Sequence, residues 1–231
     1  MPSTTLHFDA ILFDMDGTLI DSTPGVVAAW ELFAETYPTI NVQEILKNTH
    51  GVRTVETVKM FCGVTDPEKL ELEVTRFEDA IITMSQEDGR EGITLLPGVR
   101  TLIDNLGDSK HWTICTSATR GYGSAALEVV GIAPPETIVF AEDVAQGKPQ
   151  PDPYLLGAKR CGVHPKRCLV VEDAPAGVQS GRAAGCKTLA VTTSHPRDRM
   201  VASRPDYLVE NLSSVTMVPN ETGITVTITT Q

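Results

Sequence analysis

Residues 10–18 read AILFDMDGT, and this stretch decides the fold. Its first part, Ala10–Phe13, is apolar throughout, which is typical of a short strand buried on both faces of a parallel sheet. Two aspartates separated by one residue follow, Asp14 and Asp16, and Gly17 then allows a turn. Because ligands bind beyond the carboxyl ends of strands in an open parallel sheet, the stretch predicts two carboxylates in one crevice. A solvated turn is the alternative interpretation.

The same strand pattern recurs along the chain and alternates with helical periodicity. This alternation predicts parallel strands joined by crossover helices, and hence an α/β fold with a Rossmann-like parallel sheet. The further predicted strands are Thr113–Thr116, Ile138–Phe140, Leu169–Val171, Leu189–Val191 and Tyr207–Val209. The predicted helices between them are Val99–Leu106, Tyr122–Val130, Pro153–Cys161 and Ala176–Ala184. The last run, Gly223–Thr230, alternates apolar residues with Thr and predicts an edge strand or a hairpin arm.

Residues 22–94 interrupt this rhythm, because they contain helical patterns and no convincing strand. Asp66 and Pro67 supply an N-cap and a proline for the first turn of one such helix. We expect a core domain of residues 1–21 and 95–231 and a helical cap domain of residues 22–94. The predicted cap helices are Val26–Thr36, Val42–Asn48, Thr54–Phe61 and Pro67–Ser85.

The composition narrows the range of partners. The chain of 231 residues has 19 basic and 30 acidic side chains, a formal net charge of −11, which repels nucleic acid and anionic membrane surfaces. No apolar run approaches the roughly 18–20 residues of a membrane span, and the first residues do not resemble a secretory signal. The five cysteines show no C-x-x-C spacing, which favours free thiols in a reducing compartment. We expect a cytoplasmic protein, a monomer or weak dimer, that binds neither nucleic acid nor membrane.

Two further positions carry residues suited to binding a phosphate. Ser117 follows the second predicted core strand, where its hydroxyl can hold a phosphate oxygen or simply cap the next helix. Lys148 stands between Gly147 and Pro149, a stiff setting that can present a fixed positive charge to a phosphate. The spacing excludes a Walker A loop, and a solvated surface lysine is the alternative.

A further pair of acids, Glu172 and Asp173, follows the strand Leu169–Val171 directly. Asp173 can be read as a helix N-cap. Together with the first aspartates, however, the pair offers the oxygen ligands that Mg²⁺ prefers. Close carboxylates raise each other's pKa unless a cation lies between them, so the set of acids favours a divalent metal.

These four motifs, in this order and at these intervals, resemble those of the haloacid dehalogenase superfamily, and the resemblance covers essentially the whole chain. The motifs are Asp14-x-Asp16-Gly-Thr, Ser117, Lys148-Pro149 and Glu172-Asp173. Three longer stretches are similar to the fungal glycerol-3-phosphatase and 2-deoxyglucose-6-phosphatase group. These are residues 50–55 (HGVRTV), 144–154 (VAQGKPQPDPY) and 171–178 (VEDAPAGV).

The resemblance implies a Mg²⁺-dependent phosphomonoester hydrolase that acts on a small polyol or sugar phosphate through an aspartyl-phosphate intermediate. Asp14 would be the nucleophile. Asp16 would protonate the leaving alkoxide and then deprotonate the attacking water. Ser117, Ala118 and Lys148 would bind the phosphate oxygens, and Ser117 and Lys148 would also stabilise charge in the transition state.

The same resemblance implies the metal ligands and a substrate contact from the cap. The ligands would be Asp14, the backbone carbonyl of Asp16, Asp173, and Glu172 directly or through water. Arg53 is the best candidate to reach the substrate from the cap, and a solvated arginine at a helix start is the alternative. His50 is a weaker candidate of the same kind.

Two other functions remain open at this stage. A phosphosugar mutase of the β-phosphoglucomutase type carries a histidine near the position of Val26, and none of the five histidines lies there. A non-catalytic binding protein of the same fold would lack at least one chemical residue, and none is missing. Asp16 argues against a dehalogenase, and the absence of lysine in Thr23–Tyr37 argues against a phosphonatase.

Overall fold

A six-stranded parallel sheet forms the centre of the computed structural model, which describes residues 3–48, 51–86 and 92–229. The strand order is β6-β5-β2-β7-β8-β9, and all five neighbouring pairs are parallel. In that order the bounds are Ile138–Val139, Trp112–Cys115, Ala10–Phe13, Cys168–Glu172, Lys187–Val191 and Tyr207–Val209. The predicted α/β class and each of the six predicted strands are confirmed, with ends that differ by at most two residues.

Helices cover both faces of this sheet because its strands are apolar on both sides. In β2, Ala10 and Leu12 pack with Tyr154 of α7, whereas Ile11 and Phe13 belong to the larger core on the opposite face. The strand runs therefore lack polar alternation, as expected for buried parallel strands. The helices of this part are α5 (Val99–Leu106), α6 (Arg120–Val129), α7 (Asp152–Arg160), α8 (Pro175–Ala183) and α9 (Arg197–Ala202).

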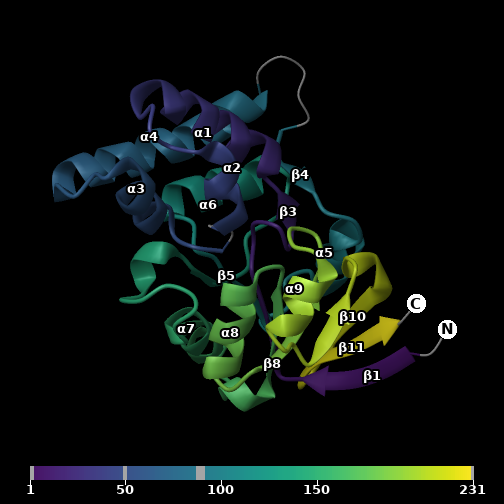
Figure 1. Cartoon of the computed structure of the whole chain (residues 1–231). Coiled ribbons are helices and arrows are strands. Elements are labelled where there is room, and N and C mark those ends of the chain that lie inside the picture. Colours follow the sequence, from purple (N-terminus) through teal and green to yellow (C-terminus); the bar gives the residue numbers. More distant parts are fainter. Residues whose placement is uncertain (1–2, 49–50, 87–91, 230–231) are drawn as a thin grey trace.

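Four helices stand together beyond one end of the sheet, at the top of Figure 1, and we call them the helical layer. They are α1 (Thr23–Thr36), α2 (Val42–Asn48), α3 (Thr54–Cys62) and α4 (Pro67–Gln86), and all four were predicted. Trp30, Phe33 and Phe77 hold α1 against α4, with Trp30 and Phe77 ring centroids 4.3 Å apart. A short antiparallel pair, β3 (Ile20–Asp21) with β4 (Thr94–Leu95), joins both ends of the insertion to the rest of the chain.

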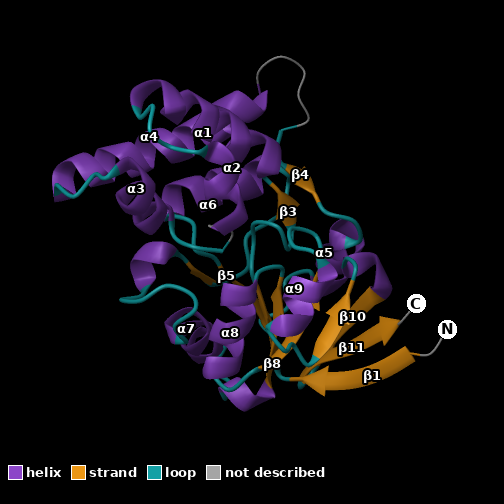
Figure 2. Cartoon of the chain, viewed as in Figure 1, coloured by secondary structure: helices purple, strands orange, loops and turns teal. Residues whose placement is uncertain are grey.

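A second sheet of three antiparallel strands unites the two ends of the chain, as Figure 2 shows. Its order is β1 (Ser3–Phe8), β11 (Gly223–Thr229) and β10 (Val215–Asn220). The interpretation of the last run as a hairpin arm is confirmed, but its interpretation as an edge strand is wrong, because β1 pairs with the free side of β11. Thr230 lies outside the described residues. Of the helices that the structure describes, none is long and apolar enough to cross a bilayer.

Candidate active site

The carboxyl ends of three adjacent strands place the predicted site residues together. β2 lies between β5 and β7, so Asp14 stands between Ser117, which follows β5, and the Glu172–Asp173 pair at the end of β7. The backbone N–H of Asp14 still donates to the Val171 carbonyl at 2.9 Å, which fixes the side chain at the sheet edge. The order of strands thus converts positions far apart in sequence into one site.

Lys148 reaches this edge from the loop before α7, where it is buried and pairs with two acids. Its ammonium pairs with Asp14 Oδ1 and lies 2.7 Å from Glu172 Oε1. Burial alone would lower the pKa of Lys148, but the carboxylates of Asp14 and Glu172 more than offset it and raise that pKa. Lys148 is therefore a permanent positive charge, and the interpretation as a solvated surface lysine does not apply to it.

Glu172 is held rigidly by four contacts at the base of the site. Besides Lys148, its Oε1 accepts the Tyr154 hydroxyl at 2.8 Å, while Oε2 accepts the backbone N–H groups of Asp173 and Ala174 at 3.0 and 3.1 Å. A Cβ at Gly177 would collide with this carboxylate, so only glycine fits at this position in the first turn of α8. The side chain has little freedom to turn elsewhere.

Three buried carboxylates form a group that fits a divalent cation. One oxygen each from Asp14, Glu172 and Asp173 lies within 4.8 Å of the others. Asp173 Oδ2 is buried and makes no hydrogen bond of regular geometry, although the Ser194 hydroxyl lies nearby. A hard dication would supply the missing partner and prefers oxygen ligands of this kind.

The charges of this group support the same conclusion. Three buried acids face one buried lysine, and an excess of two negative charges equals the charge of one dication. Without such an ion, burial is the main cause that raises the pKa of Asp14, to about 7, and the pKa of Asp173 well above its usual value. The neighbouring carboxylates add to both shifts. A bound cation would restore the ionised form of each.

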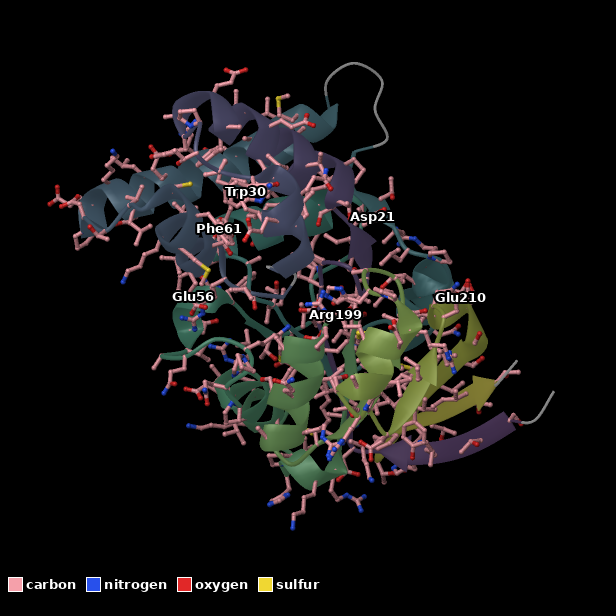
Figure 3. The ribbon with its side chains drawn as sticks, viewed as in Figure 1. Asp21, Trp30, Glu56, Phe61, Arg199 and Glu210 are labelled. Atoms are coloured by element: carbon pink, nitrogen blue, oxygen red, sulfur yellow. The ribbon has the colours of Figure 1, made fainter. Side chains whose placement is uncertain are left out.

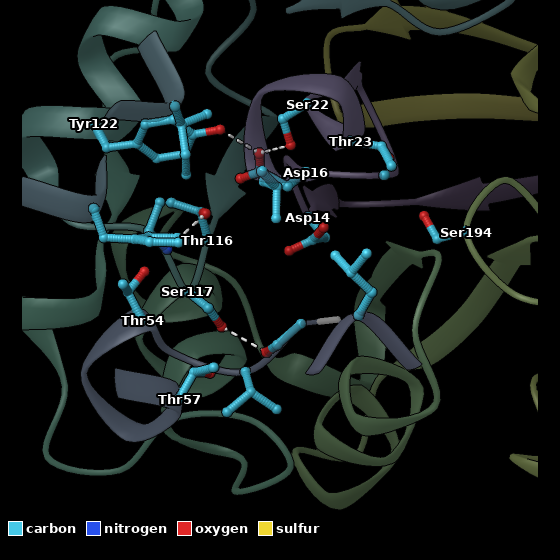
Figure 4. A pocket seen from close by; sticks show the side chains of 18 of the residues that line it. Asp14, Asp16, Ser22, Thr23, Thr54, Thr57, Thr116, Ser117, Tyr122 and Ser194 are labelled. Atoms are coloured by element: carbon cyan, nitrogen blue, oxygen red, sulfur yellow. Dashed lines mark hydrogen bonds between the residues drawn. The ribbon is translucent and has the colours of Figure 1, made fainter. Parts of the chain in front are cut away.

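Asp16 lies in a different environment from Asp14. Its Oδ1 accepts two hydroxyl groups, Ser22 at 2.6 Å and Tyr122 at 2.7 Å, both drawn as dashed lines in Figure 4. Burial raises the pKa of Asp16, although the two hydrogen bonds oppose the shift. The Asp16 carboxylate does not belong to the group of three acids, and the ligand role of its backbone carbonyl stays a prediction.

Ser117 and Ala118 follow β5 at the same edge of the sheet. The Ser117 hydroxyl donates to the Gly51 carbonyl at 2.9 Å, and the Ala118 N–H donates to Thr116 Oγ1 at 3.0 Å. Both residues line the pocket that Asp14 also lines, and Figure 4 shows Ser117 near Asp14. To donate to a phosphate bound there, the Ser117 hydroxyl would have to give up its hydrogen bond to the Gly51 carbonyl.

Arg53 lies at the start of α3 and points toward the loop that carries Lys148. Its guanidinium donates to the Val144 carbonyl at 2.8 Å and to the Ala145 carbonyl at 3.5 Å. Arg53 Nε is buried without a hydrogen-bond partner, and Arg53 is not among the residues around the cavity. Its predicted contact with a substrate stays a prediction, and His50 lies outside the described residues.

A cavity of about 120 Å³ separates the sheet edge from the helical layer. Its walls differ: Asp14, Asp16 and Ser117 come from the sheet side, and Trp30 and Phe77 come from the helical layer. Trp30 is labelled in Figure 3 within that layer. Among the residues that the structure describes around the cavity, none is Lys, Arg or His.

The sequence did not reveal several contributors to this site. Thr18 places its hydroxyl 3.3 Å from Asp14 and 3.4 Å from Asp173, and its position after Asp-Gly is the only local signal. Ser22 and Tyr122 have no such signal, because each resembles an ordinary residue of a first helical turn. Glu78, in the middle of α4, accepts the hydroxyls of Thr54 and Thr119 and resembles a surface acid in sequence.

The fold and the arrangement of acids, lysine and serine define a class of enzyme, and the comparisons agree with it. The profile described as haloacid dehalogenase-like hydrolase matches residues 8–185. The chain therefore belongs to the haloacid dehalogenase-like hydrolase family.

Individual relatives narrow this class. Hexitol phosphatase A of Escherichia coli is 38% identical, with 92% of this chain and 95% of the relative covered. Glycerol-1-phosphate phosphohydrolase 1 of Saccharomyces cerevisiae is 33% identical, with 93% and 88% covered. A solved HAD hydrolase, family IA, variant 3, of Entamoeba histolytica superposes with a TM-score of 0.76 at 24% identity, covering 90% of this chain and 95% of that one. The chain is a phosphatase of this family, and the predicted likeness to the fungal group is confirmed.

Proposed function

We propose that the chain is a Mg²⁺-dependent phosphomonoester hydrolase that acts on a small polyol or sugar phosphate through an aspartyl-phosphate. The observation that carries the proposal is the group of three buried acids with Lys148 pressed against Asp14. The printed names of the relatives, a hexitol phosphatase and a glycerol-1-phosphate phosphohydrolase, support the substrate class. Cytoplasmic location belongs to the same proposal, and the five free thiols agree with it.

In the first half of the reaction, the Asp14 carboxylate attacks phosphorus and the ester P–O bond breaks. Asp14, Glu172 and Asp173 would hold the Mg²⁺, which, when bound, supplies charge neutralisation between the carboxylate and the phosphate. Lys148 keeps its positive charge beside the attacking oxygen. Ser117 and the backbone N–H of Ala118 would bind phosphate oxygens after giving up their hydrogen bonds to Gly51 and Thr116.

Asp16 serves the leaving group and then the water. Protonated Asp16 gives its proton to the ester oxygen as the bond breaks, so the product leaves as an alcohol. The resulting carboxylate then takes a proton from the water that attacks the aspartyl-phosphate, which returns Asp14 and releases inorganic phosphate. The raised pKa of Asp16 favours the protonated form needed at the outset.

The cavity favours an uncharged leaving group. Its outer wall is apolar with scattered hydroxyls, among them Thr54 and Thr57. The described lining offers no cation to pair with a second acidic group on the substrate. Polyol and sugar phosphates meet these conditions better than diphosphates or phosphorylated acids.

The test is phosphate release by the purified enzyme with glycerol 1-phosphate and a hexitol phosphate, in Mg²⁺ and in EDTA. We expect Asp14→Asn to lose at least about 10³-fold in kcat and EDTA to abolish turnover. Asp104→Asn is the matched control, because that acid is exposed on α5 and its described ion pair is with Arg100. If Asp14→Asn or the chelated enzyme keeps wild-type turnover, the proposal is wrong.

A further inference from the structure

Two hydroxyl groups fix one oxygen of Asp16 and leave the other for the substrate. Ser22 comes from the start of α1 and Tyr122 from the first turn of α6, and both donate to Oδ1. Every hydrogen bond described for this carboxyl goes to that oxygen. An oxygen that accepts two O–H groups is poorly placed to carry a proton itself, so the proton of the acid form belongs on Oδ2.

We propose that Tyr122, assisted by Ser22, is a positioning residue that turns Oδ2 of Asp16 toward the leaving-group oxygen. The inference rests on the proposed function, because it assigns a role in the same reaction. Without the two donors, the carboxyl could rotate and present either oxygen to the cavity. With both donors in place, Asp16 can donate its proton only from Oδ2.

The chemistry of Tyr122 suits this role. Burial and the nearby Asp16 carboxylate raise the pKa of Tyr122 well above its usual value, so the phenol remains a donor at neutral pH. Its ring is buried and lines the cavity, and its hydroxyl lies 2.7 Å from Asp16 Oδ1. Tyr122 itself transfers no proton: the P–O electron pair goes to the ester oxygen, and that oxygen receives the proton from Asp16.

The helical layer also holds Tyr122 in place. Thr119 is the N-cap of α6: its hydroxyl accepts the Tyr122 backbone N–H at 3.3 Å and donates to Glu78 of α4. Glu78 is 4% exposed and also accepts the Thr54 hydroxyl at 2.8 Å. The first turn of α6, and with it the phenol, is therefore fixed from the helical layer as well as from the sheet side.

Two substrates that differ in their need for an acid separate this role from a structural one. The alkoxide of glycerol 1-phosphate requires a proton, whereas the acetate of acetyl phosphate is a weak base and leaves without one. Because kcat/KM reports the steps up to departure of the leaving group, it isolates the acid step from later hydrolysis. Both substrates are small enough for a fair comparison.

We expect Tyr122→Phe to lower kcat/KM for glycerol 1-phosphate about 10-fold or more, and that for acetyl phosphate by less than about 2-fold. Ser22→Ala should show the same selectivity, since the Ser22 hydroxyl makes no capping bond to α1. The double variant should approach Asp16→Asn without exceeding its loss. Tyr207→Phe, on β9, is the matched control and should match the wild type with both substrates.

The outcomes are distinguishable. Equal losses on the two substrates, with an unchanged melting temperature, would overturn the positioning role of Tyr122 and leave the proposed function intact. A wild-type enzyme that releases phosphate from neither substrate in Mg²⁺ would overturn the proposed function and this inference with it. A variant that melts earlier is judged by the same ratio of the two kcat/KM values, because misfolding lowers both together.

Discussion

The two walls of the cavity differ in polarity: the wall on the sheet side carries charged side chains, and the wall on the side of the helical layer is mainly apolar. On the sheet side, Asp14 lines the cavity, and behind it the buried Lys148 and Glu172 complete a closed set of charges with this aspartate. On the side of the helical layer, Val26, Trp30 and Phe77 present an apolar surface. The charged wall depends on strand order, whereas the apolar wall depends on how α1 and α4 pack.

This difference suggests that the sheet side determines the catalytic chemistry and that the helical layer determines which substrates are preferred. A closed set of charges is costly to alter, because removing one partner leaves another buried and unpaired. An apolar wall can change one side chain at a time at modest cost. We therefore expect substitutions on the sheet side to affect every substrate and substitutions in the helical layer to change the ranking of substrates.

After Asp14, the largest effect is expected at Asp16, which lies on the sheet side of the cavity. Asp16→Asn keeps the size of the side chain and its contacts but cannot donate an acidic proton. We expect kcat/KM for a polyol phosphate to fall by about 10²–10⁴-fold. Steady-state phosphate release measures it, with Asp104→Asn as the control. Loss of less than about 3-fold would show that the leaving group finds its proton elsewhere.

The next prediction concerns how the stability of the metal-free protein depends on pH through the acids of the sheet side. The raised pKa values of Asp14, to about 7, and of Asp173 mean that the folded chain holds these protons more tightly than the unfolded chain. Their contribution to stability is complete below the unfolded values near 4 and is lost as pH rises through the folded ones. The metal-free protein should therefore melt at a lower temperature at about pH 8 than at about pH 5.5.

Magnesium should reverse this trend, because it binds the deprotonated carboxylates. We expect the gain in melting temperature from a few millimolar Mg²⁺ to grow between about pH 5.5 and 8, as followed by scanning fluorimetry against an EDTA sample. Asp173→Asn should lose most of the gain. A gain of constant size over this range, or one kept by the variant, would argue against these carboxylates as the ligands.

The sequence predicts the charged wall better than the apolar one for a physical reason. Carboxyl ends of parallel strands meet at one edge, so Asp14, Ser117 and Asp173 converge wherever the strands are recognised. The strand pattern left Lys148 open as a solvated surface lysine, and only the family resemblance assigned it to the phosphate. The strand pattern therefore predicts where the acids and the serine meet, but not the whole group.

Contacts between the helical layer and the sheet edge escaped prediction because no local pattern encodes them. Ser117 meets Gly51 only after α1–α4 have packed, and Tyr122 of α6 meets Asp16 only in the packed chain. The strand β1 was missed for a similar reason, since its exposed face lacks an apolar run and its partner β11 lies at the other end of the chain. Such pairings depend on tertiary packing rather than on periodicity.

A smaller effect is expected from the apolar wall itself. Val26 is half-buried on α1 and lines the cavity, so Val26→Ala enlarges it on the side of the leaving group. We expect the ratio of kcat/KM for a hexitol phosphate to that for glycerol 1-phosphate to rise about 10-fold. Val129→Ala, exposed and remote on α6, is the control. An unchanged ratio would mean that selection lies elsewhere than in this wall.

The smallest effect is expected at Arg53, which links the start of α3 to the loop that carries Lys148. Its guanidinium binds the Val144 carbonyl from the helical layer, and the chain continues from there to Lys148. If Arg53 acts by holding this loop, Arg53→Ala should lower kcat/KM by about 5-fold for every substrate, acetyl phosphate included.

A contact between Arg53 and the substrate gives a different pattern. The loss would then increase with the number of hydroxyl groups on the leaving group and would vanish for acetyl phosphate. Arg53→Lys sharpens the contrast, because an ammonium can still meet a hydroxyl but does not reproduce the fork that reaches both loop carbonyls. We expect this variant to resemble Arg53→Ala with all substrates, since the described contacts of the guanidinium are with the loop. Recovery of wild-type kcat/KM by lysine on polyol phosphates alone would instead assign Arg53 to substrate binding.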